Sequence, residues 1–175
     1  MIRRMVFSRI LYFEGRLLTA SDFQAEQDYL RDKQRFRNLH TYGVGIVSGS
    51  SVKTQQGNAT VLISPGYAID ALGREICMSE TMECPLPQDG ERLFVCLTYV
   101  ECEADPILMS SIETGLAGAK TVYARLEEGV EVMLEVTRPS TNSSTLPVAL
   151  LRRKRTRWTR DPSFRPPRAK WLGAP

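Results

Sequence analysis

The segment between Gly15 and Gly43 constrains the fold more than any other part of the chain. It contains no Gly or Pro, and Thr19 near its start can cap a helix through its hydroxyl, with Asp22 three residues later opposing the positive helix end. Gly43 is a point where the chain can leave the helical conformation. The pattern predicts a helix over residues 20–40, preceded by a turn at residues 14–15 and a strand over residues 5–13.

This helix carries two apolar faces when its residues are placed at about 100° intervals. One face can cover the body of its own chain. The other has the heptad-like spacing of a mixed apolar and polar seam against a partner helix. Alternatively, both faces are covered inside the monomer. The first stripe consists of Phe23, Gln27, Leu30, Gln34 and Arg37, and the opposite one of Ala25, Tyr29, Phe36 and Leu39.

After Gly43 the pattern changes to short runs of period two, separated by Gly, Asn and Pro, which is typical of half-buried antiparallel strands. Residues 104–119 lack strong periodicity and are predicted to form a loop or a helical turn. The expected fold is α+β: an antiparallel β-sandwich-like body, one long N-terminal helix packed on it, and an extended basic C-terminal arm. Strands are predicted over residues 44–52, 60–65, 67–69, 75–78, 93–101, 121–127, 130–138 and 146–151, with a hairpin turn at residues 128–129.

The length of 175 residues, 42% of them hydrophobic, favours one domain over residues 1–151, with residues 152–175 as the arm. The apolar run over residues 93–100 falls well short of the roughly 20 residues that span a bilayer. No secretory signal pattern is present, so synthesis in the cytoplasm is expected. Four cysteines without a Cys-x-x-Cys pair, and a single histidine, do not suggest a metal site, and reduced, buried thiols are expected.

Positive charge is concentrated at the C-terminal end. Residues 152–175 hold nine Lys/Arg and one Asp, which leaves 14 Lys/Arg and 19 Asp/Glu in residues 1–151. The net charge is therefore +8 in the arm and −5 in the body. The cluster from Arg152 to Arg160, with Trp158 among it, could dock on an acidic protein surface, remain solvated, or neutralise phosphates and stack on a base of a nucleic acid.

No residue pattern in the sequence indicates a catalysed reaction. The segment Gly43–Gly49 follows a helix and opens a strand, which is the reverse of a dinucleotide-binding loop, so its glycines indicate close backbone approach and a bend. His40, the single imidazole, has no Ser or Cys close in sequence to form a nucleophile and base pair. No catalytic residue, metal or cofactor is predicted. An enzyme of unrecognised fold is the alternative, and it would need a deep pocket with perturbed carboxylates around His40.

Several short motifs follow one another in a set order. They are Tyr12-Phe13-Glu14-Gly15-Arg16-Leu17-Leu18, then Asp22-Phe23-Gln24, Tyr42-Gly43-Val44-Gly45, Gly66 with Asp70 and Gly73, Leu146-Pro147-Val148-Ala149, and Asp161-Pro162-Ser163-Phe164-Arg165-Pro166-Pro167. In this order they resemble the N-terminal domain of the type VI secretion baseplate protein TssK and the related shoulder domain of phage receptor-binding proteins. The helix opening also resembles small proteins that accompany phage-like contractile injection systems. Ala20-Ser21-Asp22 stands where the family has Pro-Gln-His.

The resemblance implies a non-enzymatic, trimeric baseplate or tail-attachment subunit that is assembled into an injection particle. Its partners would be copies of itself and baseplate, sheath or tail-fibre proteins, with no small-molecule substrate and no insertion into a membrane. A nucleic-acid-binding protein that uses the basic cluster is the alternative function. The expected oligomer interface comprises Phe23, Gln27, Leu30 and Gln34, supported by Phe13, Leu17 and Leu18. The expected partner-binding residues of the arm are Arg152, Arg153, Arg155, Trp158, Phe164 and Trp171, because large aromatics and Arg dominate such interfaces.

Overall fold

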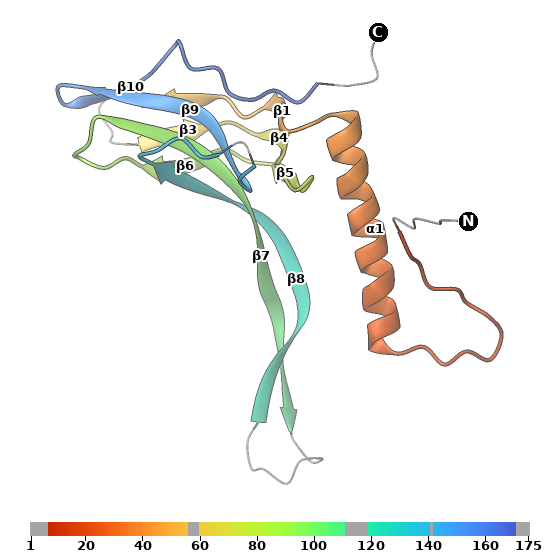
Figure 1. The fold of residues 1–175 in the computed structure, drawn as a ribbon. Coiled ribbons are helices and arrows are strands. Elements are labelled where there is room, and N and C mark those ends of the chain that lie inside the picture. Colours follow the sequence, from red (N-terminus) through yellow and green to blue (C-terminus); the bar gives the residue numbers. More distant parts are fainter. Residues whose placement is uncertain (1–6, 56–59, 111–118, 141, 171–175) are drawn as a thin grey trace.

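The computed structural model describes residues 7–55, 60–110, 119–140 and 142–170. The described part of the chain forms one long helix and a set of antiparallel strands (Figure 1). In chain order the elements are α1 (Ala20–Thr41), β1 (Gly45–Gly49), β2 (Val52–Thr54), β3 (Thr60–Ile63), β4 (Gly66–Ile69), β5 (Glu75–Met78), β6 (Met82–Pro85), β7 (Arg92–Ser110), β8 (Ala119–Glu135), β9 (Thr145–Lys154) and β10 (Arg157–Arg160). Helix α1 does not contain a stretch that is both long enough and apolar enough to cross a membrane.

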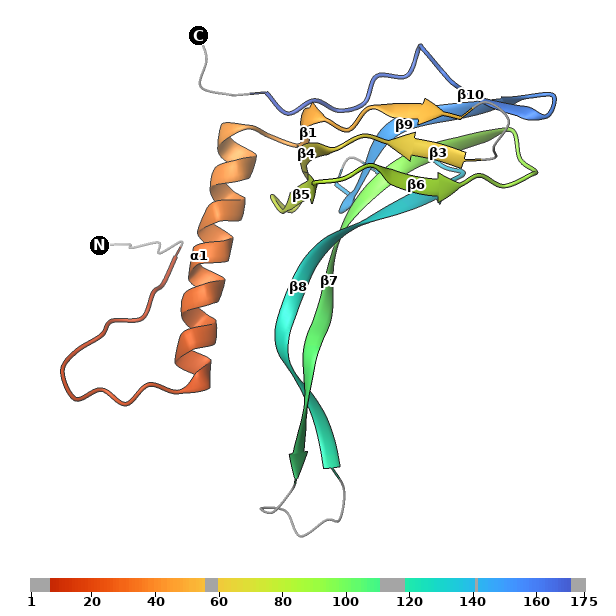
Figure 2. The same cartoon turned by 180° about the vertical axis from the view of Figure 1, so that it is seen from behind.

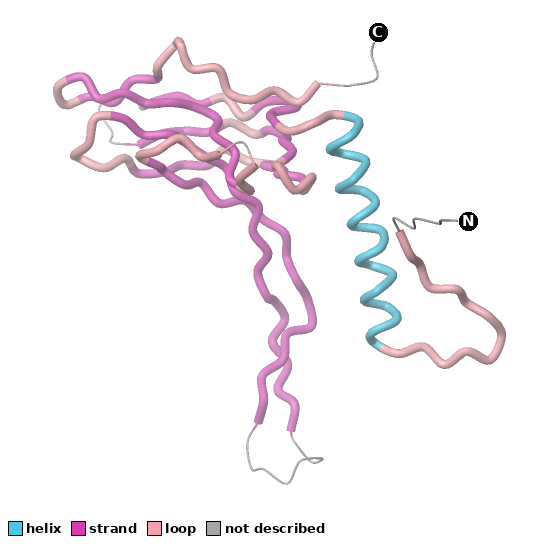
Figure 3. The backbone as a smooth tube through the Cα atoms, viewed as in Figure 1, coloured by secondary structure: helices cyan, strands magenta, loops and turns pink. Residues whose placement is uncertain are grey.

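The strands form a layered body from which two elements project (Figure 3). A four-stranded sheet of order β10-β9-β7-β8 is accompanied by two three-stranded sheets, β1-β4-β5 and β2-β3-β6. Their facing side chains make one core, which includes the fully buried Ile63, Ile76, Val95 and Leu97. One helix with three antiparallel sheets is consistent with the expected α+β class.

Strand β7 is covered on both of its faces at the centre of the body. Val95 and Leu97 point into the main core, and the alternate residues Phe94 and Cys96 point to the other side, where Phe164 covers them. The rings of Phe94 and Phe164 meet edge to face with their centroids 5.8 Å apart. The C-terminal segment is therefore part of the fold and closes the outer face of the large sheet.

The basic C-terminal arm is not extended over its whole length, which corrects the prediction. Residues 152–160 belong to the β9–β10 hairpin, so the expected boundary after Leu151 falls inside a strand. Residues 161–170 then run back across the body (Figure 1) and make a short parallel contact with β1. The backbone N–H of Ile46 donates to Pro167 O at 2.9 Å, and that of Ala169 to Ile46 O at 3.1 Å. Sparse aliphatic residues suggested an unfolded arm, but buried aromatics hold it.

Strands β7 and β8 form a long hairpin that leaves the body beside α1, as both views show (Figures 1 and 2). Strand β9 pairs with β7 only from Arg92 to Thr98, and beyond that point β7 and β8 pair only with each other among the described residues. Two predictions are therefore wrong. Residues 104–110 are strand, with residues 111–118 outside the described part, and β8 is one continuous strand where a turn at residues 128–129 was expected.

Helix α1 begins and ends where the sequence predicted, within one residue. The Thr19 backbone N–H donates to Asp22 Oδ2 at 2.9 Å, and the Asp22 N–H approaches the Thr19 hydroxyl at 3.4 Å, which together form a capping box. Gly43, with a φ of 72°, then ends the helical path. The helix is not packed along the body, however. Asn38 is its one buried residue.

The segment before the helix is not a strand over residues 7–13, and residues 5–6 lie outside the described part. It folds back beside α1 (Figure 2), and the Phe7 ring meets the rings of Tyr29 and Phe36 edge to face, with centroids 6.4 Å and 5.5 Å away. This segment thus contacts the Tyr29 and Phe36 face of the helix, although Phe36 remains 46% exposed. The prediction of body packing failed because the helix face directed at the body is polar.

Candidate assembly surface

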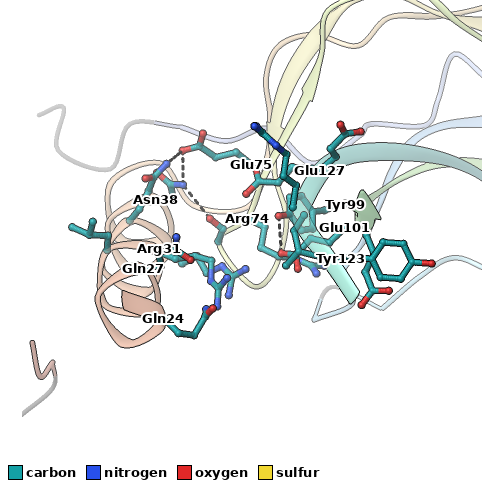
Figure 4. A pocket seen from close by; sticks show the side chains of 18 of the residues that line it. Gln24, Gln27, Arg31, Asn38, Arg74, Glu75, Tyr99, Glu101, Tyr123 and Glu127 are labelled. Carbon is teal, nitrogen blue, oxygen red and sulfur yellow. Dashed lines mark hydrogen bonds between the residues drawn. The ribbon is translucent and has the colours of Figure 1, made fainter. Parts of the chain in front are cut away.

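An open cleft separates α1 from the β7–β8 hairpin, and the turn between β4 and β5 forms its floor (Figure 4). Its volume is about 920 Å³. The helix lines it with Gln24, Gln27, Leu30, Arg31, Gln34, Arg35 and Asn38, the floor with Gly73, Arg74 and Glu75, and the hairpin with Tyr99, Glu101, Glu103, Tyr123, Ala124, Arg125, Leu126, Glu127 and Glu128.

The floor is a turn built around Asp70, whose side chain is fully buried. Its carboxylate accepts the backbone N–H groups of Leu72 at 2.8 Å and Arg74 at 2.9 Å, and the Arg74 Nε–H at 2.7 Å. The Arg74 guanidinium in turn lies 4.8 Å from the centre of the Tyr99 ring on β7. The turn therefore joins the base of the hairpin to the sheet that carries the helix contact.

The helix meets this floor through two amide side chains (Figure 4). Asn38 Nδ2 donates to Gly73 O and to Glu75 Oε1, both at 3.0 Å, and Gln34 Nε2 donates to Glu75 Oε1 at 2.6 Å. Partial burial opposes ionisation of Glu75, but these hydrogen bonds and one from Tyr67 outweigh it and lower the pKa of its carboxyl. Burial, followed by the Glu75 charge, raises the pKa of Tyr67 to about 12.

The hairpin wall of the cleft is acidic. Glu101 and Glu128 are direct cross-strand partners, and Tyr99 Oη donates to Glu101 at 2.8 Å. Burial and then these two carboxylates raise the pKa of the Tyr99 hydroxyl. None of the four glutamates on this wall forms a salt bridge with another residue of the described ranges; they are Glu101, Glu103, Glu127 and Glu128.

Three of the predicted seam residues, Gln27, Leu30 and Gln34, line the cleft. Leu30 keeps 58% of its surface exposed, and Phe23, which does not line the cleft, keeps 55%. Three apolar anchors predicted in the preceding segment are also exposed: Phe13, Leu17 and Leu18. The chain thus leaves these side chains available, and their contact with a partner stays a prediction.

Two of the predicted arm anchors are buried in the chain itself. Trp158 packs into the main core, and its Nε1–H donates to Pro87 O at 2.8 Å, whereas Phe164 covers Phe94. Arg152 Nε donates to Asp161 Oδ2 at 2.5 Å. Arg153 and Arg155 lie at the end of β9 and in the following turn, and Trp171 lies outside the described residues. A role of these residues in binding a partner stays a prediction.

Sequence reasoning missed the apolar surface of the hairpin. Ile107, Leu108, Tyr123 and Leu126 are all at least 48% exposed on its two strands. The signal was weak because Asp105-Pro106 breaks the alternating sequence pattern within β7, although the strand itself continues. Asp105 has a φ of 52°, and its carboxylate pairs with Arg125 at 2.5 Å.

His40 does not line the cleft. Its ring stacks on Phe36 with centroids 3.9 Å apart, and its Nδ1 lies 2.7 Å from the Phe36 carbonyl oxygen.

The four cysteine thiols are free, but Cys96 alone is buried, and burial raises the pKa of its thiol to about 12. The expectation of buried thiols is wrong for Cys77 and Cys102, which lie on exposed strand faces.

The fold is shared with solved structures of TssK. The chain aligns with a protein chain of a type VI secretion TssK-TssF-TssG baseplate subcomplex at a TM-score of 0.56 and 17% identity, over 91% of this chain and 62% of the other. A type VI secretion baseplate complex gives 0.54 and 17%, over 93% and 60%. The crystal structure of TssK gives 0.57 and 14%, over 91% and 42%. The chain therefore spans between 42% and 62% of the length of these three matched chains. No protein-family model and no curated protein matches the sequence.

Proposed function

We propose that this chain is a non-enzymatic structural subunit of a contractile injection system or phage-tail-like baseplate. It links neighbouring components and assembles as a homotrimer, with baseplate, sheath or tail-fibre proteins as its further partners. The shared fold with TssK supports this role, since the matched structures include baseplate complexes with other subunits. Synthesis in the cytoplasm and incorporation into a particle complete the proposal.

The observation that carries the proposal is that α1 and the β7–β8 hairpin project from the body with apolar side chains exposed on both. Leu30 is 58% exposed, and on the hairpin Leu108 is 75% and Leu126 is 60% exposed. Exposed apolar side chains gathered on projecting elements are typical of surfaces that other proteins cover. A partner seated between the two elements would remove these residues from water, and about 800 Å² per partner is enough for stable docking.

Leu30→Glu tests the seam directly. A buried carboxylate at an apolar contact is costly, so we expect the variant to sediment as a monomer while its circular dichroism stays near that of the wild type. Ala25→Glu is the matched control, because Ala25 is exposed on the other side of the same helix and should leave the oligomer intact. An unchanged oligomer in Leu30→Glu would show that the seam lies elsewhere.

Deleting the gene tests the role in the particle. If the chain is a baseplate subunit, electron microscopy of the deletion strain should show no complete contractile particles, and the wild-type gene supplied in trans should restore them. Complete, contractile particles in the deletion strain would refute the proposed function, whatever the oligomeric state of the purified chain.

A further inference from the structure

The four-stranded sheet holds two unfavourable like-charge pairs of opposite sign. Glu101 on β7 lies directly opposite Glu128 on β8, and Lys154 on β9 lies directly opposite Arg157 on β10. All four side chains are exposed, and none has a salt-bridge partner among the residues that the structure describes. Like charges placed opposite each other weaken a strand pair. Each pair would be relieved by a surface of the other sign.

The two pairs lie at separate ends of the molecule. The turn of the β9–β10 hairpin is at the end of the body farthest from α1, whereas Glu101 and Glu128 line the cleft beside the helix (Figures 1 and 4). The acidic pair is extended by Glu103 and Glu127, and the basic pair by neighbouring arginines on the same hairpin. One chain therefore carries two complementary surfaces that it cannot bring together itself.

We propose that the β9–β10 hairpin of one copy docks in the cleft between α1 and the β7–β8 hairpin of the next copy. Lys154 and Arg157 then face Glu101 and Glu128, and Leu30 lies along the same cleft. Such a contact is heterologous, because the two surfaces are different, and it produces a closed ring when the rotation between copies allows closure. This inference rests on the proposed function and names the surfaces through which the trimer forms.

The occupant is a second copy because the chain itself supplies the matching cationic hairpin. Charge complementarity of this kind selects the partner and its orientation. The turn at Arg155 has a φ of 57°, and Trp158 is anchored by Pro87 O, so the hairpin is presented in a defined shape. A defined shape lowers the entropy that docking costs.

Charge reversal tests the docking by analytical ultracentrifugation of the full chain at about 0.1 M salt, where charges are screened over about 10 Å. We expect Glu101→Lys with Glu128→Lys to weaken self-association at least about tenfold, and Lys154→Glu with Arg157→Glu to do the same. Combining all four substitutions restores opposite charges and should return the association constant to within about threefold of the wild type. Glu80→Lys with Glu83→Lys, exposed charges outside the cleft, is the control and should have no effect.

The outcomes separate this docking from the proposed function. An oligomer that persists in both double variants overturns the docking and leaves the structural role standing. Loss of association in the Lys154→Glu, Arg157→Glu variant alone also overturns the docking, because the hairpin then binds something other than the cleft. The docking is likewise overturned if the variant with all four substitutions does not associate again. A wild-type oligomer that disappears on nuclease treatment shows that nucleic acid holds the copies together. A wild type that remains monomeric at about 100 µM refutes the docking, while the gene deletion still tests the role in the particle.

Discussion

Replacing Asn38 with Ala should weaken the attachment of the helix to the body. Asn38 is only 2% exposed, and its side-chain amide donates to Gly73 O and to the Glu75 carboxylate, each at 3.0 Å. These bonds join the last turns of α1 to the turn that forms the floor of the cleft. Because α1 has no other buried residue, its attachment depends on them to an unusual degree.

The magnitude follows from the two hydrogen bonds. A neutral hydrogen bond contributes about 1 kcal/mol and one to a charged group about 1.5–3 kcal/mol. Glu75 keeps the bond from Gln34 at 2.6 Å, so the lower end of the combined range applies. We expect a loss of about 2–3 kcal/mol in the free energy of opening α1, which corresponds to a change of about 30- to 150-fold in the opening equilibrium.

Hydrogen exchange followed by mass spectrometry measures this equilibrium for the amides of α1. Asn38→Ala should accelerate their exchange by about this factor, while the amides of the central strands, held by the main core, stay protected. Gln24→Ala is the control, because Gln24 lies on the same face and bonds only within the helix, to Asp28 at 3.1 Å. Exchange of α1 within about threefold of the wild type in Asn38→Ala would refute the reasoning.

Gly73→Ala should lower the urea midpoint, because Gly73 has a φ of 78° and a Cβ there would lie 2.4 Å from a helix carbonyl oxygen. Gly15 has a φ of 82° but open space around it, so the control Gly15→Ala should cost only about 1 kcal/mol of stability. Equal losses of stability in the two variants would contradict the packing argument. The Cys96 thiol, whose pKa burial raises to about 12, should resist alkylation in the native protein while the exposed thiols react, and rapid labelling seen by peptide mass spectrometry would contradict its burial. Hydrogen bonding, first from Arg152, lowers the pKa of the Asp161 carboxyl in the folded protein. The contribution of Asp161 to stability is therefore complete above about pH 4 and is lost as the pH falls through the lowered pKa. Asp161→Asn should flatten the decline of the thermal midpoint in acid, and an unchanged slope would contradict this.

Local signals predicted the parts of the fold that local physics determines. The capping box at Thr19 and the break at Gly43 placed α1 to within one residue, and period-two patterns located the strands of the body. The close backbone approach predicted for the glycines after the helix is also confirmed, since a Cβ on Gly45 would lie 2.6 Å from the backbone of Pro167. β6 and β10, each four residues long, were missed because so few residues show little periodicity. The single strand predicted over residues 44–52 is divided into β1 and the start of β2.

The cleft could not be predicted, since it depends on contacts between distant segments. The side chain of Asn38 reaches Gly73 and Glu75 only after β4 and β5 have paired, and nothing in the helix sequence identifies Asn38 as its anchor. The cross-strand pairing of Glu101 with Glu128 likewise depends on a continuous hairpin, where a turn at residues 128–129 had been expected. Gly129 fits in the strand instead, against the side chain of Val100.

The hairpin predicts a link between folding and assembly in this chain. A two-stranded ribbon is marginally stable alone, and β7 and β8 continue as such a ribbon beyond Thr98 with Leu108 and Leu126 exposed. The Asp70 turn braces only its base, through Arg74 and Tyr99. A neighbour that fills the cleft would cover the apolar side chains and neutralise the glutamates in one step. Contact with a neighbour would therefore stabilise the part of the β7–β8 ribbon that the lone chain leaves exposed. A variant that weakens association should also lower the stability of this ribbon.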